Sequence, residues 1–234
     1  MKVALVTGSE GGIGGAVVRA FADAGYTVVG ADLVPAAEVV VDVATEAGAR
    51  RAVDAAVEQH GRLDAVVTAH GISGRSLGDG PVSECTDDAW NAVLASNLTS
   101  VFLVCRAAVP RLVDSGGGAI VMIGSVLGLV GDEDFATHAY AASKAALVGL
   151  CRAMAVHYAP SGIRVNVVAP GLIETPMSRR AQDDPGIRRR LRELQPLTGT
   201  LGHPKHVAEA ALYAARAEFV TGTVLVVDGG WTAR

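Results

Sequence analysis

Short runs of wholly apolar residues alternate with longer helical patterns along the chain, and this alternation restricts the fold more than any other feature. Strands so apolar must be covered on both faces, which is typical of a parallel sheet with helices on each side. The pattern predicts one α/β domain, residues 1–234, with a Rossmann-type doubly wound parallel sheet. Its predicted strands are Lys2–Thr7, Thr27–Gly30, Glu38–Val43, Ala65–Thr68, Ala119–Ile123, Arg164–Val168 and Val224–Val227.

Between these strands the spacing predicts helices. The long helix is expected to begin at Thr86 as N-cap, with Asp87 and Asp88 in its first turn. Glycines that follow two of the patterns, Gly25 and Gly61, are typical helix ends. The predicted helices are Ile13–Ala24, Thr45–His60, Thr86–Val113, His138–Tyr158 and Pro204–Ala215.

One connection breaks the pattern. Only the residues from Leu33 to Glu38 separate Asp32 from Val39. A parallel crossover normally needs about a dozen residues, most often a helix. We therefore expect a shortened crossover between the second and third strands, reduced to a turn that Pro35 helps to set. The rim of the sheet beside this crossover should then be lower and more open.

Composition excludes several classes of function. The formal net charge of −4 argues against nucleic acid or an anionic membrane as the main partner. The apolar run in MKVALVTG is too short for a signal peptide, and no apolar run reaches the roughly 18 residues that a membrane helix needs. Cys85, Cys105 and Cys151 are isolated, so neither a disulfide framework nor a metal site is expected. A cytoplasmic protein is the expectation.

A glycine turn follows the first strand. Thr7–Gly14 has the sequence T-G-S-E-G-G-I-G and leads directly into a helix. Glycines allow a tight turn and the close approach of a pyrophosphate, and the helix N-terminus offers free N–H groups. A purely structural turn is the alternative, but a strand before and a helix after favour dinucleotide binding. The candidate cofactor-binding residues here are Gly8, Gly12, Ile13 and Gly14.

The second strand ends near an acid, Asp32. A carboxylate there can accept hydrogen bonds from an adenosine ribose and would repel a 2′-phosphate. Leu33 offers no cation for that phosphate, and Glu10 adds another negative group. These residues favour NAD(H) over NADP(H). Asp42 and Val43, at the end of the third strand, could flank the adenine.

A second constellation concerns proton transfer. Tyr140 and Lys144 are spaced i, i+4 on a predicted helix, so that the phenol and the ammonium share a face. The Lys144 ammonium, joined by the positive nicotinamide ring of a bound cofactor, should lower the pKa of the phenol, which would make Tyr140 a general acid or base. Ser125 follows a strand end, where its hydroxyl could hold a substrate oxygen. Asn97 lies inside a predicted helix, where asparagine is unfavourable unless its side chain makes a structural or functional hydrogen bond. Taken alone, each residue could equally be structural.

Taken together, these motifs make the chain resemble the short-chain dehydrogenase/reductase family over essentially its full length. The resemblance implies the strand order 3-2-1-4-5-6-7, a homotetramer or homodimer, and Tyr140 as general acid/base. It also implies that Lys144 binds the nicotinamide ribose, that Ser125 orients the substrate oxygen and that Asn97 helps to hold a proton-relay water. The matched features are Thr7–Gly14, Asp32, Asp42, Val43, Asn97, Ser125, Tyr140–Lys144, Pro170, Gly171, Ile173, Thr175 and the closing Asp228, Gly229 and Gly230. Of these, Pro170 to Thr175 would cover the nicotinamide amide.

The sequence departs from the family at one motif. The family's N-N-A-G after the fourth strand is replaced by Thr68-Ala69-His70-Gly71. Thr68 and Gly71 remain candidate cofactor-binding residues, because a hydroxyl can still hydrogen-bond and glycine keeps the backbone close. His70 is more simply interpreted as a partly exposed loop residue than as a catalytic one.

The substrate side carries two conflicting signals. Residues 176–200 should form a mobile lid, and an arginine-rich lid suits an anionic substrate. A solvated helix face with Leu191 and Leu194 packed inward is the favoured interpretation. The neighbouring acidic segment, residues 131–135, would instead repel an anion. The arginines of the lid are Arg179, Arg180, Arg188, Arg189, Arg190 and Arg192.

The leading hypothesis is therefore an NAD(H)-dependent oxidoreductase that interconverts a small secondary alcohol and its ketone. The resemblance favours a cyclic alcohol or a dihydrodiol. A reductase of 3-oxoacyl or polyketide ketones is the enzymatic alternative, although most such relatives prefer NADPH. A non-catalytic NAD(H)-sensing regulator would predict a damaged Tyr–Lys pair, whereas here the pair is intact.

Overall fold

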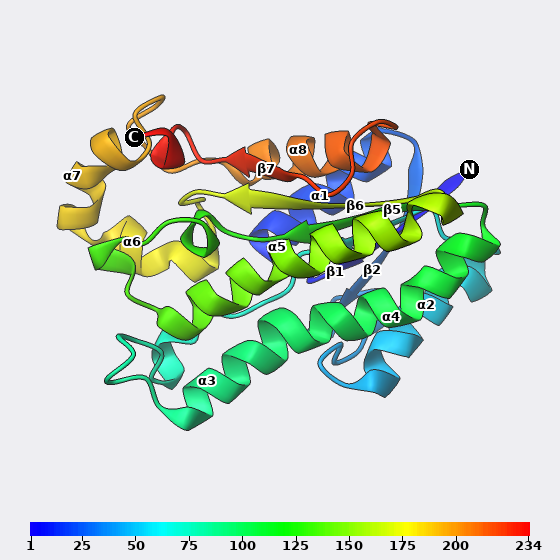
Figure 1. Ribbon diagram of the computed structural model, residues 1–234, viewed down its shortest axis with the longest axis horizontal. Coiled ribbons are helices and arrows are strands. Elements are labelled where there is room, and N and C mark those ends of the chain that lie inside the picture. The colour runs from blue at the N-terminus through cyan, green and yellow to red at the C-terminus, as the bar shows by residue number, and fades with distance from the viewer.

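The computed structural model describes residues 1–234. A seven-stranded parallel sheet forms its centre, with the order β3-β2-β1-β4-β5-β6-β7, which confirms the predicted fold (Figure 1). The strands are β1 (Lys2–Thr7), β2 (Tyr26–Asp32), β3 (Val39–Val40), β4 (Ala65–Thr68), β5 (Gly118–Ile123), β6 (Ile163–Pro170) and β7 (Val224–Val227).

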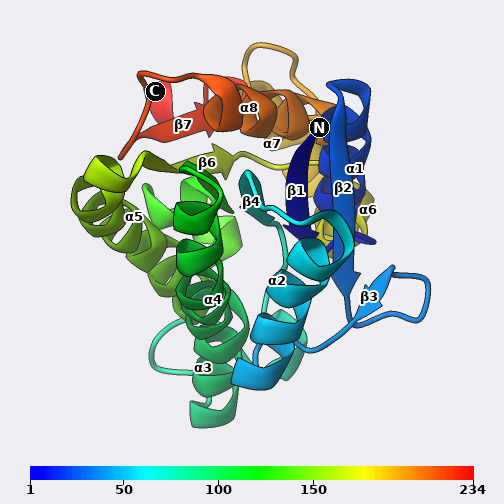
Figure 2. The same cartoon turned by 90° about the vertical axis from the view of Figure 1, so that its right-hand side faces the viewer.

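Helices cover both faces of the sheet. On one face lie α1 (Gly12–Asp23) and α8 (Pro204–Arg216), and on the other α2 (Glu46–His60), α4 (Ser100–Asp114) and α5 (His138–Tyr158) (Figures 1 and 2). Side chains of β1 alternate between the two cores: Val3 and Leu5 pack towards α2 and α4, whereas Ala4 and Val6 pack towards α1. This alternation explains why the strands are apolar throughout.

The predicted long helix is interrupted. Thr86 caps α3 (Asp87–Leu94) as expected, because its hydroxyl accepts a hydrogen bond from the N–H of Ala89 at 3.1 Å. One turn of π-helix, Ala95–Thr99, then separates α3 from α4. A π turn widens the backbone by one residue, and such turns occur often at functional sites. The prediction of one regular helix over Thr86–Val113 was therefore wrong at the turn that contains Asn97.

The crossover from β2 to β3 contains no helix, as the short spacing predicted. The third strand is shorter than the predicted Glu38–Val43, since only Val39 and Val40 pair with β2. Val41 and Val43 are nevertheless buried, against the core formed with α2. Their apolar character reflects packing against the core with α2 and not ladder pairing with β2, which is why the pattern overstated the strand.

The predicted lid contains two short helices, α6 (Arg179–Asp183) and α7 (Pro185–Leu194), next to the carboxyl ends of the strands (Figure 1). Asp184 caps α7, where its carboxylate accepts hydrogen bonds from the N–H groups of Gly186 and Ile187. Ile187, Leu191 and Leu194 are buried. The helix therefore packs its leucines inward, as predicted.

Two helical stretches, residues 87–114 and 138–161, are long and apolar enough to cross a membrane by length and composition. In the fold they cover one face of the sheet, and each buries a face against it: Val101 and Val104 of α4 and Leu147 of α5 belong to the core. Core helices of α/β domains commonly meet the same criterion, so this is weak evidence for a membrane span.

Candidate active site

The glycine turn forms a tight cradle at the end of β1. Gly8 adopts φ 74°, and a side chain there would approach the backbone nitrogen of His70 to 2.7 Å. A methyl group on Gly14 would overlap the carbonyl oxygen of Gly8, and one on Gly12 would meet the Thr175 side chain at 2.8 Å. No side chain caps the start of α1. The closely packed backbone of this turn leaves room for a pyrophosphate, and the uncapped N-terminus of α1 offers free N–H groups to it. The end of β1 therefore suits the binding of a nicotinamide dinucleotide.

Two connected pockets, of about 480 and 440 Å³, run along the carboxyl ends of the strands. The first follows the glycine turn and the ends of β2 and β3; the second lies over β5, β6 and α5. Gly71, Ile13 and Thr175 border both. Among the predicted site residues, the first pocket also contacts Gly8, Gly12, Asp32, Asp42 and Val43, and the second also contacts Ser125, Tyr140, Lys144, Pro170, Gly171 and Ile173.

Three predicted residues do not line either pocket: Gly14, Thr68 and Asn97. Gly14 is buried behind the turn that it allows. Thr68 is almost fully buried, and its hydroxyl has no hydrogen-bond partner. An unpaired buried hydroxyl is unfavourable, and the geometry gives Thr68 no direct access to the cleft.

Asp32 joins the glycine turn to the end of β2. Its carboxylate accepts hydrogen bonds from the backbone N–H of Glu10 at 3.0 Å and of Leu33 at 2.6 Å. The Leu33 side chain next to it is 66% exposed and brings no charge. Asp32 therefore presents an oriented carboxylate to the first pocket, next to Glu10 and Asp42.

Asn97 clamps the loop that follows β4. From the π turn, its carboxamide oxygen accepts a hydrogen bond from the N–H of Ile72 at 2.8 Å, and its amide nitrogen donates to the carbonyl of Ile72 at 2.9 Å. The same nitrogen donates to the hydroxyl of Ser143 at 3.2 Å. Gly71 lies so close that a side chain there would meet Asn97 at 2.8 Å. Asn97 thus ties the cofactor-side loop to α5.

His70 links three elements through both ring nitrogens. Nδ1 lies 2.6 Å from the hydroxyl of Thr7, and Nε2 lies 2.7 Å from the hydroxyl of Ser100. Because the Ser100 hydroxyl donates its one hydrogen to the carbonyl of Ser96, it must accept from His70, which places the proton on Nε2. Nδ1 then accepts from Thr7. His70 is partly exposed in a loop, as predicted, but this double linkage was not foreseen.

Tyr140 and Lys144 meet at the floor of the second pocket. The Lys144 ammonium lies 5.7 Å from the centre of the Tyr140 ring and donates a hydrogen bond to the carbonyl of Ile123 at 2.9 Å. Burial lowers the pKa of Lys144 to about 8. Ser125 begins a short turn after β5, where its oxygen accepts a hydrogen bond from the N–H of Leu127 at 3.2 Å.

The predicted fall in the pKa of Tyr140 is not found in the chain by itself. Burial raises that pKa, and a hydrogen bond with Ser125 opposes the rise only in part. Desolvation disfavours the phenolate, and Lys144 hydrogen-bonds to the Ile123 carbonyl instead of the phenol. The predicted fall relied on Lys144 together with the positive nicotinamide ring, so it stays a prediction for the protein with its cofactor bound.

A further carboxylate that the sequence did not reveal holds α5 in place. Asp79, almost fully buried, accepts hydrogen bonds from the backbone N–H groups of Ala139 and Tyr140, each at 3.0 Å. Thr137 precedes α5 but provides no side-chain cap. Asp79 therefore supplies, from a distant loop, the negative group that a helix N-terminus favours. Because threonine is a residue type that normally caps helices, no local signal in the sequence pointed to Asp79.

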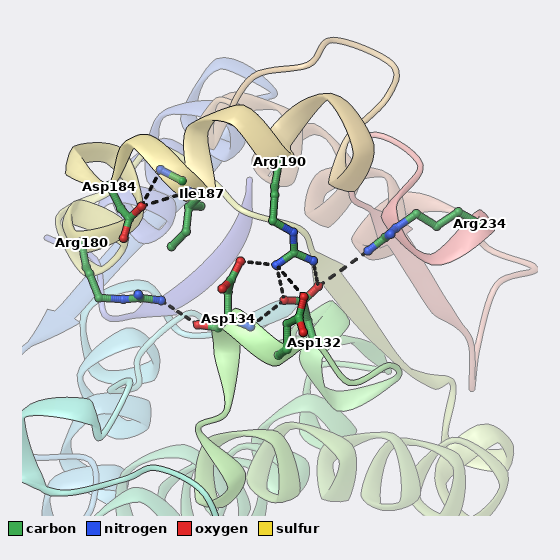
Figure 3. Close-up of polar contacts among 9 residues, drawn as sticks. Asp132, Asp134, Arg180, Asp184, Ile187, Arg190 and Arg234 are labelled. Carbon is green, nitrogen blue, oxygen red and sulfur yellow. Dashed lines mark hydrogen bonds and ion pairs between the residues drawn. The ribbon is translucent and has the colours of Figure 1, made fainter.

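The conflicting charges on the substrate side neutralise each other. Arg190 of α7 forms ion pairs with Asp132, at 3.0 Å, and with Asp134 (Figure 3). These carboxylates raise the pKa of Arg190 further above its ordinary value. Arg234, at the end of the chain, lies 3.6 Å from Asp132. Arg180 donates to the backbone carbonyl of Asp134 at 2.8 Å. The acidic segment is thus bound to the arginine-rich lid.

Comparison with known proteins agrees with this geometry. A family model described as enoyl-(acyl carrier protein) reductase matches residues 8–232. Cis-4-hydroxycyclohexanecarboxylate dehydrogenase of Sinomonas cyclohexanicum is 37% identical over 99% of this chain and 97% of its own length. A putative ketoacyl reductase of the granaticin polyketide synthase, from Streptomyces violaceoruber, is 39% identical over 97% of this chain and 95% of its own. The solved structure of a short-chain type dehydrogenase/reductase from Mycobacterium ulcerans superposes with a TM-score of 0.91 at 29% identity, covering 100% of this chain and 90% of that one.

His70 makes the fold sensitive to acid. Burial, with the charge of Lys144, lowers its pKa to about 3, below the ordinary 6.5. The folded state therefore binds fewer protons than the unfolded state between those values, and stability should fall as the pH drops below 6.5. Between pH 6 and pH 5, we expect urea unfolding to show a loss roughly 1 kcal/mol larger in the wild type than in His70→Gln. Parallel pH profiles for the two proteins would contradict this account.

Proposed function

Since the chain belongs to the short-chain dehydrogenase/reductase family and is an oxidoreductase of CH–OH groups and ketones, we propose that it interconverts a small secondary alcohol and its ketone with NAD(H). The observation that carries this proposal is the arrangement of Tyr140, Ser125 and Lys144 around one pocket next to the glycine cradle. When bound, the nicotinamide dinucleotide donates or accepts the hydride.

In this proposal Tyr140 exchanges a proton with the substrate oxygen, and Ser125 hydrogen-bonds to that oxygen. The raised pKa of Tyr140 keeps the phenol protonated, which suits donation to a ketone. Alcohol oxidation needs the phenolate, which a positive nicotinamide ring near Tyr140 and Lys144 favours. Lys144 would also hold the nicotinamide ribose, while Pro170, Gly171, Ile173 and Thr175 would border the amide.

We assign the cofactor as NAD(H) from the charges of the first pocket. Glu10, Asp32 and Asp42 all border it, and no lysine or arginine does. A 2′-phosphate would meet three carboxylates without a counter-ion, whereas a free ribose can donate hydrogen bonds to Asp32. Gly8, Gly12, Ile13 and Gly14 would form the phosphate turn, with Val43 at the adenine and Gly71 behind the ribose. Thr68 would support that wall from beneath.

A cyclic alcohol or a dihydrodiol is the preferred substrate class, supported by the relative that acts on cis-4-hydroxycyclohexanecarboxylate. The similarity to a putative ketoacyl reductase supports reduction of 3-oxoacyl or polyketide ketones as the second candidate. The segment that contains α6 and α7 would act as the substrate lid, because Arg180 and Ala181 of α6, and Met177 just before it, border the second pocket.

We also propose a cytoplasmic setting. All three cysteines are free. Burial raises the pKa of Cys105 to about 12 and that of Cys151 to about 11, which keeps both as thiols. Free thiols are the normal state of proteins in a reducing compartment.

Exposed apolar side chains further support a homotetramer, with a homodimer as the smaller alternative. Phe219, between α8 and β7, is fully exposed, and Tyr213 and Val226 are exposed on the two elements that flank it. On the other side of the sheet, Phe102 of α4 and Val156 of α5 are exposed. Two apolar surfaces on different faces suit assembly along two axes.

The proposed chemistry is tested by following absorbance at 340 nm with NAD or NADP against cyclic alcohols, ketones and ketoacyl thioesters. We expect turnover of a cyclic alcohol with NAD, and a loss of roughly 10²- to 10⁴-fold in kcat/KM for Tyr140→Phe with NADH binding preserved. Tyr158→Phe, at the far end of α5, is the matched control and should retain activity. Turnover of thioesters alone would favour the second candidate, and tight NADH binding without any turnover would favour a sensing regulator.

The cofactor assignment is tested by Asp32→Ala combined with Leu33→Arg. Removing the carboxylate and adding a cation should raise the NADP/NAD ratio of kcat/KM by about 10- to 100-fold, the range of one charge-assisted contact. Leu33→Ala is the control, and Asp32→Asn shows how much comes from the hydrogen bonds to Glu10 and Leu33. An unchanged ratio in the double variant would refute the role of Asp32.

The assembly is tested by sedimentation equilibrium. We expect a native mass four times the 23.9 kDa of one chain. Phe219→Asp should lower that mass, because a charge cannot be buried there without cost, whereas Val82→Asp, at an exposed loop position, should leave it unchanged. A wild-type protein that sediments as a monomer would contradict the proposal.

A further inference from the structure

We propose that the substrate carries an anionic oxygen group, such as a carboxylate, which Arg75 and Arg180 bind at the second pocket while Tyr140 acts on the carbinol or ketone. This inference rests on the proposed function, because it names the substrate class of the same pocket. It concerns the opposite end of the substrate from the reacting carbon.

The charged side chains in the wall of the second pocket are all positive. Arg75, Lys144 and Arg180 border the second pocket, and no aspartate or glutamate does. The chain as a whole has a formal net charge of −4, so this concentration of positive charge is local. A cleft lined by one sign of charge attracts ligands of the opposite sign.

The nearby carboxylates are already engaged. Asp132 and Asp134 pair with Arg190, and Asp132 also lies near Arg234 (Figure 3). Asp79 accepts two backbone hydrogen bonds at the start of α5. The acidic segment therefore neither cancels the arginines of the pocket nor repels an anion as strongly as its sequence suggested.

Arg75 has no partner within the protein. It begins a short turn, Arg75–Leu77, and its guanidinium forms no hydrogen bond or ion pair. Partial burial and the positive charge of Arg180 lower its pKa, the charge of Asp79 opposes this fall only in part, and arginine stays charged at neutral pH. Two guanidiniums that repel each other at one pocket wall are stabilised by an oxyanion that contacts both.

Arg180 is held with donors to spare. It uses one N–H for the carbonyl of Asp134, and its guanidinium lies over the Phe135 ring, 5.6 Å from the ring centre. A guanidinium has five N–H donors, so further hydrogen bonds are free for a ligand. In contrast, Arg179, the neighbouring residue on α6, does not border the pocket.

The apolar side chains of the second pocket indicate the chemical nature of the rest of the substrate. Leu127, Phe135, Leu172 and Trp231 border the same pocket. Apolar and aromatic walls suit a hydrocarbon ring or chain. The substrate class is therefore an alcohol or ketone on an apolar body with an oxyanion elsewhere on it.

The test compares two ketones that differ in charge alone: 4-oxocyclohexanecarboxylate and its carboxamide. We expect the wild type to reduce the carboxylate with at least 10-fold higher kcat/KM. Arg75→Gln should lower kcat/KM for the carboxylate by about 10- to 100-fold, mainly through KM, and change that of the carboxamide less than threefold. Arg75 is exposed and its side chain forms no hydrogen bond or ion pair within the protein, so this variant should fold normally. Arg180→Gln should act in the same direction.

Arg179→Gln is the matched control and should leave both ketones unaffected. Equal use of the two ketones, or equal losses on both in Arg75→Gln, would overturn the anion site while leaving the proposed oxidoreductase function intact. Competition by cyclohexanecarboxylate, cyclohexanesulfonate and cyclohexyl phosphate distinguishes which oxyanion the arginines prefer.

A binding measurement keeps the two proposals separable if neither ketone is turned over. Trp231 borders the pocket, and in a Trp90→Phe background it is the one remaining tryptophan. We expect cyclohexanecarboxylate to change its fluorescence with a Kd at least 10-fold lower than that of the carboxamide, and Arg75→Gln to remove the difference. Binding without turnover would refute the proposed chemistry alone, and no preference for the anion would refute the anion site.

Discussion

All strands of the sheet run in the same direction, and every part of the site depends on this constraint. The segments that follow β1, β4, β5 and β6 must then leave the sheet at one edge. The glycine turn, the His70 loop, Ser125 and Pro170 come from distant parts of the sequence and meet there. Burial of the strands on both faces fixes that edge rigidly, because the two cores pack against opposite sides of the same backbone.

The side chains of the site are held in place at this edge by hydrogen bonds between different elements, and no single helix positions them all. Asn97 ties the loop after β4 to α5 through Ile72 and Ser143, and Lys144 ties α5 to the end of β5. Asp79 holds the first turn of α5, and with it the backbone of Tyr140. Each link satisfies a polar group that would otherwise be buried alone, so local stability and the geometry of the site have the same cause.

The sequence was sufficient for features that follow from local chemistry. Wholly apolar strands predicted the parallel sheet, the i, i+4 spacing predicted that Tyr140 and Lys144 share a face, and the short segment after Asp32 predicted a crossover without a helix. It failed where tertiary contacts decide. Val41 and Val43 pack against the core with α2 without pairing in the sheet, and local helix propensity does not predict the π turn at Asn97. The cap of α5 comes from Asp79, 59 residues before its first helical residue. The pKa of Tyr140 also depends on burial, which no spacing reveals.

The two pockets of the cleft are bordered by charges of opposite sign, and the ion pairs of Arg190 with Asp132 and Asp134 contribute to this separation. At the adenosine end three carboxylates border the pocket without a cation, and at the other end three cations border it without a carboxylate. In the sequence the second end carries both signs, since residues 131–135 are acidic and the lid is basic. The fold pairs Asp132 and Asp134 with Arg190, between α7 and the acidic segment, which weakens the effect of these acids on the pocket and leaves Arg75 and Arg180 at its wall. The same ion pairs join α7 to residues 132–134, so the contacts that position this helix also govern the charge near the pocket.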